Sequence, residues 1–580
     1  MPDHFTAVAQ KLQPVFVPAI SDSTAILKRY WKWSVLTAAI IAAAYISLIV
    51  TIDNTNLGTT NGLWKSPVVY AWGHQGDGPL DSGGLLYAPV YGIFTRLIPD
   101  SWLQYGTPAA DLTFRKMAIL NAILGGAASG LVFLLAIRFT ASPLSATAIS
   151  LIHAGAGFVL LNSINSEDII PAYTLFLGAT VCFFEYLHQG GIPLFAASAL
   201  LLALAALFHW TVMVPGIAAI GSVYAALLTR GRRFFWAGLG WLFLFLVFLQ
   251  VLVLAAFPLR HIPVWAVLYP GKADAAGWVG FFGEKGWNLV VGVGNYFAGA
   301  NNMTDYQAAF ANASVFRLMI VSWAVLALAL GACLVTMARR RKPSAVSLLA
   351  IFALTLFVVG EAGAVYSQPQ DPQMQIEPMF ATIPGMILLL VPGWGLGSVR
   401  LRKGLAGVLA LAGAANFGWN VHLMRSGIGG DSKAIAAIAE LNRLFPSNTT
   451  VIVCHGFETW TTWQYVILWR NDSPGFISKS IHLARAFTMN RGIRGAEAAA
   501  ITEERIDSAL ASGQRVVAAA LWTEPAEKSV GTYTTVTTQA QANTYDSLLR
   551  NHYRLATRWS TLLGPFVELL PAAAGTGDGQ

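Results

Sequence analysis

Charged residues are scarce in this sequence. Asp, Glu, Lys and Arg together make up 11% of its 580 residues, whereas hydrophobic residues make up 55%. Soluble domains carry about 25% charged residues. The composition therefore excludes a soluble globular protein and predicts an integral membrane protein with many spans.

Cysteine is also rare, and the three cysteines lie far apart in the sequence. Two of them, Cys182 and Cys333, fall in apolar segments, so no disulfide framework is expected. The first 25 residues lack an apolar segment followed by a small-residue cleavage site, so we expect the first hydrophobic segment to be retained as an anchor. No Walker A motif, no GxGxxG after a strand and no CxxC pair is present.

Eleven apolar segments alternate with polar connections along the first 424 residues. Each has roughly 17–24 residues, which is enough to cross about 30 Å of hydrocarbon as a helix. The segments are residues 34–52, 116–137, 143–161, 170–188, 192–208, 211–228, 234–257, 317–337, 346–365, 379–396 and 405–421. Lys and Arg cluster in the connections of one side, as they do on the cytoplasmic side of membrane proteins. This pattern places residues 1–33 in the cytoplasm and explains the net charge of +8 without nucleic acid.

The connections on the opposite side are long, polar and acidic. They are predicted as outer loops, at residues 53–114, 162–169, 258–316 and 366–378. Within the first of these loops, the sequence predicts a short interfacial helix over residues 85–98, with Tyr87, Tyr91 and Phe94 toward lipid.

The composition changes after residue 424. Residues 449–454 and 515–521 have the pattern of short buried strands, with helical patterns between them. Strands that alternate with helices predict a small α/β domain with a parallel sheet. The predicted fold is therefore an α-helical polytopic membrane domain with about eleven transmembrane helices (residues 34–424), a C-terminal α/β soluble domain on the outer face (residues 425–570) and a disordered tail (residues 571–580).

The first outer loop contains a polar stretch that is rich in glycine and aromatic residues and holds two carboxylates, Asp77 and Asp81. A carboxylate near a membrane surface is suited to act as general base toward an acceptor hydroxyl. The neighbouring glycines permit close approach of a ligand, and Trp72 and Tyr87 are suited to stack on sugar rings. The alternative interpretation is a solvated turn with ordinary interfacial aromatics. The sequence does not decide which of the two acids is the base.

A second acidic element, Glu167 and Asp168, precedes a predicted span. Acids at this position stabilise a helix N-terminus through its dipole. The other interpretation is a second part of an active site that orients the acceptor or a divalent cation. Two adjacent acids are a weak metal signal, because hard cations bind six or more oxygens.

Several outer residues are candidates for substrate binding. Basic side chains there are suited to bind a lipid phosphate or diphosphate, or else anionic headgroups. Gln370 and Asp371 are suited equally to sugar hydroxyls and to loop packing. His209, at the tip of a predicted hairpin, is a further candidate, although such residues more often anchor a hairpin at the interface. The basic candidates are Arg260, His261, Lys272, Lys285 and Arg317.

The pattern resembles the GT-C superfamily of polytopic glycosyltransferases. The matching features are the long acidic first loop with Asp77 and Asp81, the Glu167–Asp168 pair before Pro171, the hairpin LLALAALFHWTVMVPGIAAI, and the late loop QPQDPQMQIEPM before a span. The resemblance implies polyprenyl-phosphate or polyprenyl-diphosphate sugar donors, inversion at the anomeric carbon and a first-loop Asp as base. It also implies a divalent cation such as Mg²⁺ or Mn²⁺ in the oligosaccharyltransferase branch, although no extended DxD signature is present.

The expected function is transfer of a sugar from a polyprenyl-phosphate donor to a glycan, lipid or protein acceptor at the outer face of a bacterial inner membrane, in cell-envelope glycan synthesis. The C-terminal, periplasmic domain would bind acceptor. The alternatives are a transporter or lipid flippase, and a catalytically inert assembly subunit of the same fold. Transporters place ionisable residues near the bilayer centre and show internal repeats, whereas the polar residues here gather at one face.

Overall fold

The structure, a computed structural model, describes most of the hydrophobic part of the chain and part of the remainder. The chain groups into two compact units. The first comprises Met1–Ile52, Pro79–Phe94 and Met117–Gly427, and the second comprises Asp53–Gly78, Thr95–Lys116 and Ile428–Gln580. The described residues are 23–51, 69, 72–73, 85–99, 109–256, 284–299, 313–339, 343–366, 372–392, 398–426, 440–441, 443–446, 449–454, 480–482, 495–519, 547–562 and 564–571.

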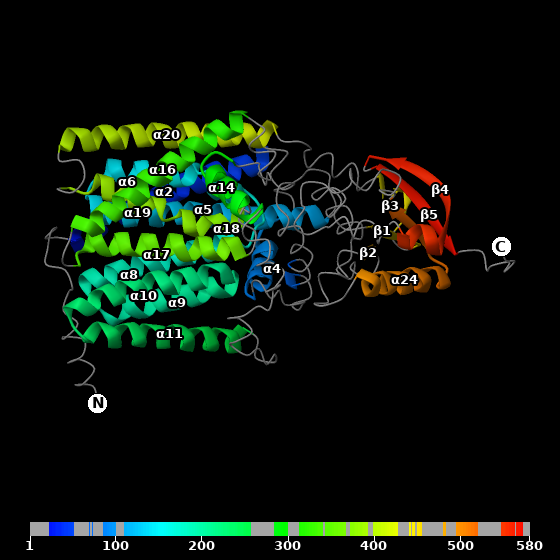
Figure 1. Ribbon diagram of the computed structural model, residues 1–580, viewed down its shortest axis with the longest axis horizontal. Coiled ribbons are helices and arrows are strands. Elements are labelled where there is room, and N and C mark those ends of the chain that lie inside the picture. The colour runs from blue at the N-terminus through cyan, green and yellow to red at the C-terminus, as the bar shows by residue number, and fades with distance from the viewer. Residues whose placement is uncertain are drawn as a thin grey trace. The chain divides into compact units, whose positions relative to one another are not determined.

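The first unit is helical, and its long helices α8, α9, α10, α11 and α17 lie side by side (Figure 1). Its long helices are α2 (Ser23–Thr51), α5 (Ala109–Thr140), α8 (Ile169–Gln189), α9 (Ile192–Phe208), α10 (Met213–Leu227), α11 (Arg233–Ala256), α16 (Ala313–Arg339), α17 (Ala345–Tyr366) and α20 (Val399–Ser426). The shorter helices are α4 (Tyr87–Leu97), α6 (Pro143–Gly155), α7 (Gly157–Ile164), η2 (Trp210–Val212), η3 (Leu228–Arg230), α14 (Glu284–Asn295), α18 (Pro372–Met379) and α19 (Thr382–Leu390).

Every apolar segment predicted to span contains helix, and the chain is an integral, multi-pass membrane protein. Among the described residues, eight helices are long and apolar enough to cross a membrane, or nine if the bent pair α6 and α7 forms one span. Helix α9 has the 17 residues predicted for it, whereas α19, in the predicted segment 379–396, has only nine.

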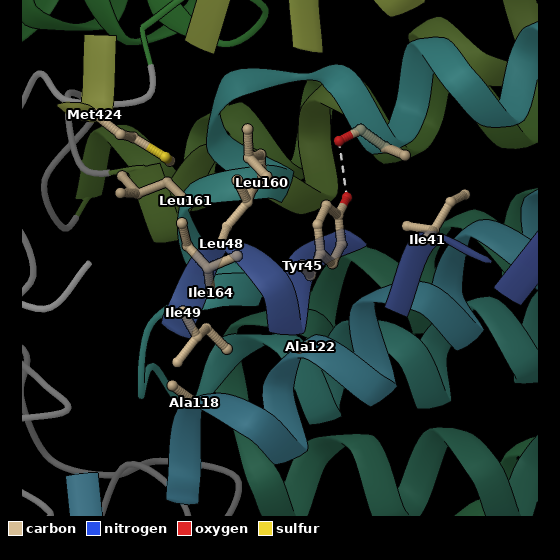
Figure 2. Packing of buried hydrophobic residues seen from close by; sticks show 11 residues of the cluster. Ile41, Tyr45, Leu48, Ile49, Ala118, Ala122, Leu160, Leu161, Ile164 and Met424 are labelled. Carbon is tan, nitrogen blue, oxygen red and sulfur yellow. Dashed lines mark hydrogen bonds between the residues drawn. The ribbon is translucent and has the colours of Figure 1, made fainter. Parts of the chain in front are cut away.

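Close helix packing in this unit depends on glycine. A methyl group at Gly126 of α5 would lie 2.5 Å from the carbonyl oxygen of Ala38 in α2, and Ser34 donates a hydrogen bond to the Gly130 carbonyl at 2.7 Å. Small residues let helix backbones approach in this way within membranes. The same helices meet α7 and α20 in a buried apolar cluster that includes Leu48 and Leu160 (Figure 2).

The chain bends by 66° between α6 and α7. A break inside a membrane protein exposes peptide groups that must find partners within the protein. Here the amides of Gly157 and Phe158 donate to the carbonyls of Phe297 and Tyr296, at 2.8 and 3.1 Å.

Side chains from α2 and α20 complete the support of this bend. The Tyr45 hydroxyl donates to the Ala154 carbonyl at 2.7 Å, as Figure 2 shows. The amides of Asn416 and Asn420 donate to the Gly155 carbonyl at 2.7 and 2.9 Å. With these partners the bend is stable, and it fixes the direction in which α7 leads to residues 165–168.

The second unit contains a five-stranded sheet in the order β2–β1–β3–β5–β4. Helix α24 (Gly495–Ala511) packs on one face of it, with Ile506 in the core. Strands β1 and β3 were predicted, but the expectation of a wholly parallel sheet is wrong, because β5 pairs antiparallel with both β3 and β4. The strands are β1 (Thr450–Cys454), β2 (Ser480–His482), β3 (Arg515–Ala519), β4 (Tyr553–Thr561) and β5 (Gly564–Pro571).

Some segments expected to be exposed loops are buried or helical. Residues 372–379, in the predicted late loop, form α18. Residues 165–168, in the predicted second loop, are fully buried. The predicted interfacial helix is present as α4, but the expectation that Tyr87 and Tyr91 point to lipid is wrong, since both side chains are buried.

The glycine contact between α2 and α5 predicts that Gly126→Ala destabilises the protein. The new methyl group must displace backbone, and overpacking of this kind costs about 1–3 kcal/mol. The matched control is Gly407→Ala in α20, where the added methyl group would have no atom within 4 Å. The measurement is thermal unfolding of both variants in detergent. Equal melting temperatures for the two variants would contradict the packing described.

Candidate active site

Two carboxylates are buried at one end of the helical unit. Glu167 and Asp168 lie in the short connection between α7 and α8, and both are fully buried. Asp168 occupies the N-cap position of α8 without a side-chain capping hydrogen bond. The Asp168 carboxylate therefore does not cap the helix, and capping does not explain why it is buried.

The backbone of this connection is held by side chains from α4 and α5. The Asn121 amide donates to the carbonyls of Asn165 and Glu167, both at 2.6 Å. The Tyr91 hydroxyl donates to the Asn121 side-chain oxygen, and the Tyr87 hydroxyl donates to the Ser166 carbonyl at 2.5 Å. Because each of these partners is itself buried, the connection has a fixed conformation.

Helix α18 also contacts the acidic pair. Gln373 and Glu377 are four residues apart and so lie on one face of this helix. The Gln373 amide donates to Glu167 Oε2. Gln375, on another face, donates instead to Glu361 of α17 at 3.1 Å.

His209 connects Asp168 to Glu377. Its Nε2 atom lies 3.8 Å from Asp168 Oδ1, and its Nδ1 atom lies 2.6 Å from the Thr211 hydroxyl oxygen. That hydroxyl oxygen lies 3.1 Å from Glu377 Oε1. A carboxylate, an imidazole, a hydroxyl and a second carboxyl group thus follow one another, and each is supplied by a different element or connection.

Burial changes the acidity of groups at this site. Loss of solvation raises the pKa of Glu377 to about 8, and the negative charge of Asp168 acts in the same direction. Burial, with the charge of Asp168, also raises the pKa of Tyr91 well above its usual value. Glu377 is therefore an acid that holds its proton at neutral pH.

No protein-family model and no curated protein matches the chain. Solved structures do match. The crystal structure of ArnT from Cupriavidus metallidurans bound to undecaprenyl phosphate matches with a TM-score of 0.52 at 13% identity, over 94% of this chain and 98% of that one. The chain has a GT-C fold. The same protein in the apo state matches with a TM-score of 0.41 at 13% identity, over 93% of this chain and 98% of that one.

The structure brings together four of the predicted site residues on this GT-C fold: Tyr87, Glu167, Asp168 and His209. Tyr87 supports the backbone and does not present an open stacking face, since it is fully buried. Trp72 is half-buried, and Arg317 is exposed near the start of α16. The predicted residues Asp77, Asp81, Arg260, His261, Lys272, Gln370 and Asp371 lie outside the described residues, as does the side chain of Lys285.

Sequence reasoning did not identify Asn121, Thr211 and Glu377 as parts of the site. Asn121 could have been singled out from the sequence, because an amide inside an apolar span needs a buried hydrogen-bond partner. Two further buried cations, Arg115 and Lys116, precede Asn121 on the same helix.

A divalent cation needs several oxygen or nitrogen ligands grouped around one point. Within the described ranges, no three or more His, Cys, Asp or Glu side chains are grouped so that they would bind a metal ion. Glu167 accepts a hydrogen bond from Gln373, and the ring of His209 faces Asp168. The described residues therefore do not fit a metal site.

The hydrogen bond from Tyr91 to Asn121 predicts that Tyr91→Phe destabilises the protein by about 1–3 kcal/mol, because the Asn121 oxygen loses its donor while buried. The matched control is Tyr224→Phe. The Tyr224 hydroxyl is buried and has no hydrogen-bond partner among the described residues, so its removal is expected to be neutral or stabilising. Thermal unfolding of both variants checks this, and a larger loss in the Tyr224 variant would refute it.

Proposed function

We propose that this protein is a membrane glycosyltransferase that moves a sugar from a polyprenyl-phosphate donor to a glycan, lipid or protein acceptor. The observation that carries the proposal is the buried acidic site on a fold shared with ArnT, whose crystal structure is bound to undecaprenyl phosphate. Buried carboxylates at the end of a membrane bundle are costly, and such groups are usually functional.

The distribution of charge supports a site on the outer face of a bacterial inner membrane. Helix α8 begins beside Asp168 and ends near Glu185, which pairs with Arg138 at 3.0 Å. Helices α11 and α20 begin with basic residues at Arg233 and Arg400. The positive-inside rule assigns this basic end to the cytoplasm, so the acidic end and the C-terminal domain would face the periplasm.

In the proposed reaction, the acceptor hydroxyl attacks the anomeric carbon of the donor. A carbon–oxygen bond forms to the acceptor, the bond from the anomeric carbon to the phosphate oxygen breaks, and polyprenyl phosphate leaves with inversion. Asp77 or Asp81 accepts the hydroxyl proton, as the superfamily resemblance implies. Glu167 and Asp168 orient the acceptor, and their fixed backbone provides the required precision.

Cations would stabilise the negative charge of the departing phosphate. The outer segment supplies Arg260, Lys272, Lys285 and Arg317 as candidates. In this proposal the C-terminal domain binds the acceptor.

Sugar transfer by purified protein with a panel of polyprenyl-phosphate sugars tests the function. We expect Asp77→Asn or Asp81→Asn to lower the rate by about 10²–10⁴, as loss of a general base does. Asp168→Asn is expected to lower it as well, through loss of acceptor orientation. Glu361→Gln is the matched control, since Glu361 is another buried acid that binds only Gln375 among the described residues.

The alternatives give different results. A lipid flippase would move the donor across a liposome membrane without forming a glycoside. An inert subunit would show neither activity, and the Asp variants would then equal the wild type. Either pattern would overturn the proposal.

A further inference from the structure

Thr211 stands between two groups that compete for its single hydroxyl hydrogen. His209 Nδ1 lies 2.6 Å from the hydroxyl oxygen, and Glu377 Oε1 lies 3.1 Å from it. A hydroxyl donates one hydrogen bond and accepts others. The protonation of Glu377 therefore limits which hydrogen bonds the hydroxyl makes with His209.

The other ring nitrogen of His209, Nε2, faces a carboxylate. Nε2 lies 3.8 Å from Asp168 Oδ1, within reach of an ion pair. A neutral imidazole carries its hydrogen on one nitrogen only, and the bond made by one nitrogen decides the state of the other. An Nε2–H attracts the Asp168 carboxylate, whereas a bare Nε2 lone pair repels it.

We propose that Glu377 positions His209 against Asp168 through Thr211. In the protonated state the Glu377 carboxyl donates to Thr211, the Thr211 hydroxyl donates to Nδ1, and the ring presents Nε2–H to Asp168. His209, Thr211 and Glu377 are thus positioning residues for the acceptor-orienting carboxylate. This inference rests on the proposed function for its effect on catalysis, and on the geometry alone for its effect on His209.

Ionisation of Glu377 reverses the arrangement. A carboxylate only accepts hydrogen bonds, so the Thr211 hydroxyl turns to donate to Glu377. Nδ1 of His209 must then carry the hydrogen and donate to Thr211. Nε2 becomes a lone pair that faces Asp168, and the carboxylate loses the attraction of the Nε2 hydrogen.

The burial of Glu377 sets the pH at which this reversal occurs. Its pKa is raised to about 8 by burial, with a smaller contribution from Asp168. Below that pH the Glu377 carboxyl is protonated and His209 presents Nε2–H to Asp168; above it the Nε2 lone pair faces Asp168, so activity falls on the alkaline side.

The other titratable groups around α18 are Glu167 and Asp168 before α8, Tyr173 in α8, His209 after α9, Tyr296 after α14 and Glu361 in α17.

Histidine NMR tests the positioning directly, without any sugar transfer. The full-length protein is labelled with ¹⁵N and ¹³C in histidine, and the His209 signals are assigned by their loss in His209→Gln. We expect the wild type to change from the Nε2–H to the Nδ1–H tautomer between about pH 6.5 and about pH 9.5. Glu377→Gln and Thr211→Val should each abolish that change, whereas Glu361→Gln should retain it.

Two NMR results would overturn the proposal. One is a single His209 tautomer, or an imidazolium, at every pH in the wild type. The other is a tautomer change that persists in either Glu377→Gln or Thr211→Val.

The pH profile of sugar transfer gives the catalytic consequence. Wild-type activity should fall about tenfold for each pH unit above the Glu377 pKa, and this alkaline limb should be absent in Glu377→Gln. Glu361→Gln should keep the limb. If the tautomer changes but the wild type transfers no sugar at any pH, the positioning stands and the proposed function fails. If the wild type is active and Glu377→Gln keeps the limb, the positioning role in catalysis fails and the proposed function stands.

Discussion

The bend between α6 and α7 is the feature on which the rest of the site depends. Peptide groups in a membrane must bond within the protein, and here Phe297, Tyr296 and Asn420 supply the partners. Because these partners come from α20 and from the residues that follow α14, the bend forms only in the folded helical unit. It carries α7 to a connection that is fully buried, and so places Glu167 and Asp168 inside the protein.

Because these carboxylates are buried, they need hydrogen-bond donors or positive charge from the residues around them. Amide donors hold the connection and one carboxylate, while the ring of His209 faces the other. Burying these carboxylates costs desolvation free energy, and their hydrogen-bond and electrostatic partners offset part of that cost. Glu377 is protonated at neutral pH for the same reason: burial and the charge of Asp168 make a further ionised carboxylate unfavourable here.

The sequence predicted the helices well, because long apolar runs indicate spans directly, and it predicted the GT-C fold and strands β1 and β3. It pointed to Glu167, Asp168 and His209 as candidates. It did not indicate that Thr211 meets Glu377, because these residues are 166 positions apart and only the packing of α18 brings them together. Strands β4 and β5 were also missed. In β4, the shift in register between Leu555 and Arg558 interrupts a simple alternating pattern.

The most direct test of the central claim is a cryo-EM structure of the full-length protein with polyprenyl phosphate. We expect density for the phosphate at the acidic end of the helical unit, beside the connection that holds Glu167 and Asp168. The lipid chain would extend along the helices from that point. Phosphate density at the opposite, basic end, beside Arg138 and Arg230, would show that the acidic end is not the donor site.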